Sequence, residues 1–199
     1  FIYQIRKLAI TFYVELVSSA SVVMLPAIAI YAFVLIPNLT LGPLDVPMLP
    51  VTDRIVDYFD HSALQIFMVM LMTFFGGQLI WRERDSRLNE ISDATPASNT
   101  VMLISKYLSL ALIIVTVHLV FMVAAILIQL SREYYEFNFP LYLQMLFGVQ
   151  LLENLMFAAV AVAIHVVLNQ KYVSHLAVMF FYVYTVAAPR FGLEHKLLI

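Results

Sequence analysis

Four polar side chains stand out in a long apolar stretch of the sequence, residues 141–168. They are Gln150, Glu153, Asn154 and His165. Amide and imidazole groups donate and accept hydrogen bonds, and a carboxylate accepts them. Such groups are costly in an apolar environment unless they have partners or reach water. We therefore treat these residues as candidates for a functional role.

Helical geometry relates the four residues to one another. At 100° per residue, Gln150, Asn154 and His165 point within about 60° of one another, and Glu153 lies about 60° to the other side. A rise of 1.5 Å per residue makes this a polar stripe about 22 Å long on one flank of a helix. Two interpretations stay open. The stripe could hold a bundle together by interhelical hydrogen bonds, or it could line a translocation path or lateral opening for a substrate.

A metal site is a third possibility, and the spacing argues against it. Glu153 and His165 would have to meet His118 of another helix. Twelve residues separate the first two, which is about 18 Å along one helix and too far for a single ion. The chain has no Cys and only five Gly, and these glycines form no phosphate-binding motif. We expect no metal, no cofactor and no catalytic residue in this chain.

The composition describes the environment of these residues. Of the 199 residues, 63% are hydrophobic and 12% are charged, and the net charge is −2. Soluble domains are about 45–50% apolar and about 25% charged. The composition therefore excludes an ordinary soluble domain and a disordered chain, and the small net charge does not indicate nucleic acid as a partner. It predicts an all-α integral membrane protein embedded in a lipid bilayer.

Five apolar stretches have about the length that a bilayer-spanning helix needs. The predicted spans are residues 16–36, 63–81, 107–128, 141–168 and 172–188. The stretches are too long for the strands of a membrane barrel and lack their alternation. We expect a bundle of about five transmembrane helices that forms a single domain over residues 1–199.

Basic residues orient this bundle. With five spans, seven of the eleven Lys and Arg residues fall on one side and four on the other. The positive-inside rule makes the first side cytoplasmic, so the N-terminus lies inside and residues 37–62 form a long outer loop. Thr52 follows Pro50 in that loop and predicts the start of a short surface helix. Ser98 or Asn99 is suited to cap the helix of the third span.

Charge is concentrated between the second and third spans, in residues 82–99. Arg84, Leu88 and Ile91 follow helical spacing, which predicts a short amphipathic helix on the cytoplasmic side, and Pro96 ends it. A solvated loop and a helix that docks on a soluble partner both remain open. The residues that would form the docking segment are Arg82, Glu83, Arg84, Asp85, Arg87, Leu88, Glu90, Ile91, Asp93 and Pro96.

A wider pattern surrounds this segment. It consists of Gly76-Gly77-Gln78-Leu79-Ile80-Trp81-Arg82-Glu83-Arg84-Asp85, Asn89-Glu90, Asp93-Ala94-Thr95-Pro96 and Ser105-Lys106. The pattern resembles the permease subunits of ABC-2 type transporters. The resemblance implies that residues 82–99 contain a coupling helix contacting an ABC ATPase subunit. It also implies an ATP-driven exporter, a second permease half or homodimer partner, and a location in the inner membrane of a bacterium.

Further matches suggest a narrower group. They are Pro50-Val51-Thr52, Asn169-Gln170-Lys171-Tyr172 and Gly192-Leu193-Glu194-His195. They are similar to the bacterial permeases whose chains continue into an M1 aminopeptidase-like domain, so the chain looks like a fragment of a membrane region. It has no His-Glu-x-x-His motif, and ATP hydrolysis is expected from another subunit.

The alternative function is a non-transport membrane anchor or regulatory module of a larger complex or of a fused peptidase-like domain. An intramembrane enzyme is the third hypothesis, and no nucleophile–base or metal constellation supports it.

Overall fold

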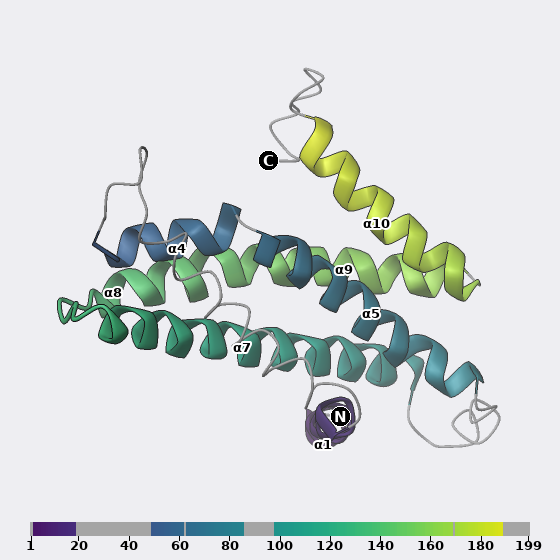
Figure 1. Cartoon of the computed structure of the whole chain (residues 1–199). Coiled ribbons are helices and arrows are strands. Elements are labelled where there is room, and N and C mark those ends of the chain that lie inside the picture. Colours follow the sequence, from purple (N-terminus) through teal and green to yellow (C-terminus); the bar gives the residue numbers. More distant parts are fainter. Residues whose placement is uncertain (1, 19–48, 62, 86–97, 169, 189–199) are drawn as a thin grey trace.

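The computed structural model describes residues 2–18, 49–61, 63–85, 98–168 and 170–188. Every regular element within these ranges is a helix (Figure 1). The elements are α1 (Ile2–Leu16), α4 (Thr52–His61), α5 (Ala63–Asp85), α7 (Asn99–Ser131), α8 (Phe139–Tyr142), the π-helix η3 (Leu143–Gln150), α9 (Leu151–Val167) and α10 (Lys171–Ala187). The all-α class that the sequence predicts is confirmed for this part of the chain.

Two long apolar helices form the centre of the bundle. One is α7, with 33 residues, and the other is the continuous run of α8, η3 and α9, with 29 residues. At 1.5 Å per residue they are about 50 Å and about 43 Å long, which exceeds the roughly 30 Å thickness of a bilayer's hydrocarbon core. The two helices lie side by side and run antiparallel, connected by residues 132–138 (Figure 1).

Helix α5 packs against this pair and also contacts α4 and α10. Its apolar part is Gln65–Trp81. A Cβ atom added to Gly76 would lie 3.7 Å from Leu110 of α7 and 3.9 Å from Val162 of α9. The three helices therefore meet around this small residue, where α5 has no side chain to hold them apart.

Helix α4 covers one end of the bundle. Ile55 and Phe59 are buried, whereas Asp53 and Asp57 are exposed. The ring of Phe59 stacks on that of Phe121 in α7, with a centroid distance of 5.3 Å. The helix predicted at Thr52 is thus confirmed as an amphipathic helix whose apolar face packs on the core.

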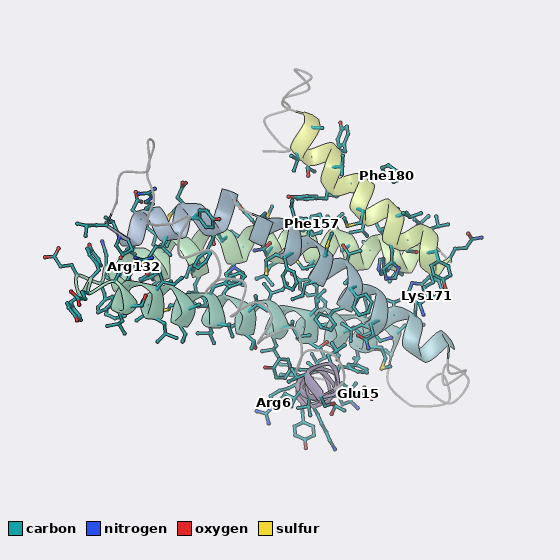
Figure 2. The ribbon with its side chains drawn as sticks, viewed as in Figure 1. Arg6, Glu15, Arg132, Phe157, Lys171 and Phe180 are labelled. Carbon is teal, nitrogen blue, oxygen red and sulfur yellow. The ribbon has the colours of Figure 1, made fainter. Side chains whose placement is uncertain are left out.

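Helix α1 precedes the first span that the sequence predicts and overlaps it only at Leu16. It packs across α7: Ser105 Oγ donates to the Ile5 carbonyl at 3.4 Å, and the hydroxyls of Tyr13 and Thr116 share a hydrogen bond of 2.9 Å. Figure 2 shows Arg6 and Glu15 on this helix. Such charged residues interrupt the apolar run, which is why hydropathy alone does not reveal α1.

Helix α10 packs against α5 and α9. It diverges from them toward its C-terminal end (Figure 1). The ring of Phe157 in α9 packs edge-on against Tyr182, with centroids 6.0 Å apart. Phe180, by contrast, points away from the bundle and is 71% exposed (Figure 2).

The predicted spans agree with the helices to different degrees. In the described part of the chain, α7 and the helix of residues 139–167 are long and apolar enough to cross a membrane, and α5 has a shorter apolar part. The helix containing the third span begins earlier than that span, at Asn99, and the Ser98 hydroxyl caps it by accepting from the Val101 N–H at 3.4 Å. Most of the span at 16–36 lies outside the described residues. The total of five spans stays a prediction.

Candidate functional site

Buried polar side chains follow one another through the interior of the bundle, and we call this set the polar seam. They come from α4, α5, α7 and the helix of residues 139–167. The members of the polar seam are Thr52, Thr73, His118, Gln129, Tyr142, Gln150, Asn154 and His165. Buried polar groups of this kind are expected to be hydrogen bonded, so their partners show how the seam is built.

One end of the seam is a saturated cluster around Gln129, which we call the Gln129 cluster. The Gln129 amide donates to the Pro50 carbonyl at 2.9 Å and to Thr52 Oγ1 at 3.1 Å. Its carbonyl oxygen accepts from the Tyr142 hydroxyl at 2.8 Å. Thr52 Oγ1 also accepts from the Asn138 N–H at 3.3 Å. The cluster ties α4, α7, α8 and the connection between the two long helices together.

The middle of the seam joins α7 to α9. His118 Nδ1 lies 2.9 Å from the Ile114 carbonyl, and because a carbonyl only accepts, this nitrogen carries the proton. His118 Nε2 then accepts from the Asn154 amide at 3.5 Å. Asn154 Oδ1 is buried without a hydrogen-bond partner among the described residues. Nearby, the Gln150 amide donates to the Val56 carbonyl of α4 at 3.4 Å.

The other end is a close contact of α5, α9 and α10, which we call the His165 junction. It consists of Gly77, His165 and His175. His165 Nε2 donates to the Thr73 carbonyl at 3.1 Å, and the centroids of the two imidazole rings are 4.8 Å apart. A Cβ atom on Gly77 would lie only 2.5 Å from His175 Nε2 and 2.7 Å from His165 Nε2. The junction can therefore form only because residue 77 has no side chain.

Three of the four polar residues predicted on one flank belong to the polar seam. Gln150, Asn154 and His165 are buried, whereas Glu153 is on the exposed surface of α9. The separation of Glu153 from the three buried residues follows from helical geometry, because Glu153, Asn154 and His165 all lie in the regular helix α9. The role of the stripe, as a path or as interhelical hydrogen bonding, stays a prediction.

Sequence reasoning missed several members of the seam. Gln129 carried a usable signal: it follows His118 by eleven residues, close to three helical turns, and so shares its face of α7. Tyr142 of the seam had no such signal, and neither had His175 of the adjoining His165 junction, because their roles depend on how α8 and α10 are placed against other helices.

The docking segment is described only at its start. Residues 82–85, which are Arg82, Glu83, Arg84 and Asp85, form the last turn of α5. Residues 86–97 lie outside the described residues, and with them Arg87, Leu88, Glu90, Ile91, Asp93 and Pro96. Only eight residues, or about 12 Å of helix, separate Gly77 from Asp85. The His165 junction is thus the part of the polar seam nearest to the docking segment.

An apolar hollow of about 400 Å³ opens between α7 and α9. It is lined by Leu103, Ile104, Tyr107, Ala159, Val162, Ala163, Val166 and Val167. None of these residues belongs to the polar seam. In this conformation the seam is closed by contacts between helices and does not open into the hollow.

Comparison with known proteins identifies the family. The model of the ABC-2 family transporter protein matches residues 13–187. The chain therefore belongs to the ABC-2 transporter family, as a membrane protein with apolar helices. Membrane components of this family are typically non-catalytic, and the ATPase lies elsewhere. No curated protein and no solved structure matches the chain.

Proposed function

We propose that this chain is the permease component of an ATP-driven ABC-2 exporter, coupled to a separate ATPase subunit through residues 82–99. The family match over residues 13–187 supports the transporter class. The observation that carries the coupling role is the course of α5. This one helix runs from the buried contacts around Gly76 to Asp85, where the charged docking segment continues.

A continuous helix is a suitable transmitter of movement. Because its backbone hydrogen bonds lie within the segment, α5 moves as a unit, and its buried side chains contact α7, α9 and α10. ATP binding by the partner would displace the docking segment and move α5 relative to α7. The polar seam would then exchange its present hydrogen bonds for contacts with water or substrate, which opens a path between the helices.

The proposed orientation places the docking segment in the cytoplasm, with the N-terminus also inside. Figure 2 shows Arg132 and Lys171 at opposite ends of the two long helices. In the proposed orientation, Arg132 belongs to the four basic residues of the outer side and Lys171 to the seven of the cytoplasmic side. A bacterial inner membrane and a second permease half or homodimer partner complete the proposal. The resemblance to permeases fused to an aminopeptidase-like domain adds an alternative role as membrane anchor of such a domain.

The test replaces the apolar residues of the docking segment. Burying Leu88 and Ile91 against a partner is worth roughly 1.5–3 kcal/mol each before ordering costs. We expect Leu88→Asp with Ile91→Asp to reduce co-purification of the ATPase by at least tenfold while the chain still inserts. The matched control is Leu49→Asp with Val51→Asp, two exposed apolar positions beside α4. Equal ATPase recovery from both double variants would contradict the proposal.

A further inference from the structure

The His165 junction has a geometry that the family assignment does not explain. Three helices meet there, and both imidazole rings are held in place by backbone carbonyls. His165 Nε2 donates to the Thr73 carbonyl of α5 at 3.1 Å, and His175 Nδ1 donates to the Lys171 carbonyl of α10 at 2.7 Å. With their rings fixed in this way and 4.8 Å apart, the two histidines form a rigid contact between α9 and α10.

Both imidazole rings pack against α5 at Gly77. The Thr73 carbonyl stands four residues before Gly77 and lies in the same turn of α5. His165 Nε2, which donates to that carbonyl, lies only 2.7 Å from the point where a Cβ of residue 77 would stand. His165 is fully buried, so its ring has no room to withdraw. A side chain at position 77 would therefore push His175 outward and force α9 away from α5, which breaks the hydrogen bond.

The neighbouring glycine provides a contrast. A Cβ on Gly76 would lie 3.7 Å from Leu110 and 3.9 Å from Val162, which are ordinary van der Waals distances. The two glycines share their helix, their depth and their backbone conformation. They differ in the atoms that a Cβ methyl group would contact if the glycine were replaced by alanine.

We propose that Gly77, His165 and His175 are positioning residues for coupling. They fix the cytoplasmic end of α5 against α9 and α10, so that a displacement of residues 82–99 moves all three helices together. This inference rests on the proposed function, because it assigns a role to residues that touch neither the ATPase nor a substrate. It explains why α10, which diverges from the bundle further along, is anchored close to the docking segment (Figure 1).

The first experiment compares Gly77→Ala with Gly76→Ala in the permease–ATPase complex. We expect Gly77→Ala to retain the ATPase on co-purification and to lose its stimulation by at least fivefold. Gly76→Ala should stay within twofold of the wild type. Thermal unfolding of both variants measures any general loss of packing. Equal stimulation in the two variants would overturn the proposal.

A second comparison tests the hydrogen bond and the ring pair directly. A glutamine amide is able to replace an imidazole Nε2–H as donor to the Thr73 carbonyl, so His165→Gln should keep stimulation within twofold. His165→Leu should lose it by at least threefold while keeping the ATPase bound. In a double-mutant cycle, adding Gly77→Ala to His175→Ala should cost less stimulation than Gly77→Ala costs alone, because the His175 change removes one of the two rings that the methyl group meets.

These variants also separate the two proposals. If Gly77→Ala fails to accumulate in the membrane, the His165→Gln and His165→Leu pair decides, and equal stimulation in that pair would contradict the inference. Additive losses in the double-mutant cycle would contradict it as well. A wild-type chain that recovers no ATPase overturns the proposed function, and this inference with it. A wild-type complex that is stimulated, with variants that do not differ, overturns this inference alone.

Discussion

The two ends of the polar seam hold helices together in different ways. In the Gln129 cluster, one amide side chain makes three hydrogen bonds of 2.8–3.1 Å to α4, α8 and the segment before α4. In the His165 junction, one hydrogen bond of 3.1 Å crosses between helices, and His165 Nδ1 is buried without a partner in the described part of the chain. Here the contact depends on the absence of a side chain at Gly77.

This difference suggests that the two ends of the polar seam respond differently when the helices are displaced. A saturated cluster of hydrogen bonds resists displacement, because every movement leaves buried donors or acceptors without partners. At the His165 junction a single hydrogen bond crosses between helices, and α5, α9 and α10 are held to one another mainly by the fit of the two imidazole rings against Gly77. The end of the bundle next to the docking segment can thus shift as one unit relative to the Gln129 cluster, as the proposed coupling requires.

The largest effect on stability is expected at the saturated end. Gln129→Leu removes three hydrogen bonds and leaves the Thr52 and Tyr142 hydroxyls buried without their partner. Unsatisfied buried groups cost about 1–3 kcal/mol each, although membrane reference states reduce this. We expect a loss of roughly 2–4 kcal/mol, measured by thermal or denaturant unfolding in detergent. Gln144→Leu, at an exposed position of η3, is the control. Equal losses in both variants would remove the distinction between the two ends.

The positions of the helices are predicted from the sequence better than the contacts between them are. The apolar runs locate α5, α7, α9 and α10, because burial in lipid or in a helix bundle selects apolar residues over the whole length of each helix. Hydropathy misses α1, since Arg6, Lys7 and Glu15 dilute its apolar face. Its packing on α7 is a tertiary contact that no local pattern encodes.

Only those members of the polar seam that lie on one helix could be grouped from the sequence. Gln150, Asn154 and His165 lie on one helix, so a helical wheel suffices to group them. Gly77 and His175 come from two other helices and are brought to His165 only by the crossing of α5 and α10. The Gly76-Gly77 pair suggested a family resemblance, but the different surroundings of its two members become visible only in three dimensions.

A smaller effect is expected in the middle of the seam. Asn154→Leu removes one long hydrogen bond, 3.5 Å to His118 Nε2, and also removes the buried Asn154 Oδ1, which has no partner among the described residues. The loss of the bond and the removal of an unsatisfied acceptor oppose each other. We expect a change within about 1 kcal/mol in the same unfolding assay. A loss as large as that of Gln129→Leu would mean that the middle of the seam is as tightly held as the Gln129 cluster.

The smallest effect is expected just outside the seam, at the residue next to Asn154. Glu153 is exposed on α9. Glu153→Gln keeps the shape of the side chain and one acceptor oxygen, replaces the other oxygen by an NH2 donor and removes the charge. Substitutions at exposed positions usually change the free energy of unfolding by less than about 0.5 kcal/mol. The same unfolding assay on the single chain, with Asn154→Leu measured beside it, checks this value. A loss above that of Asn154→Leu would show that the Glu153 charge contributes more to stability than the buried amide beside it, and the seam would have to be extended to this flank of α9.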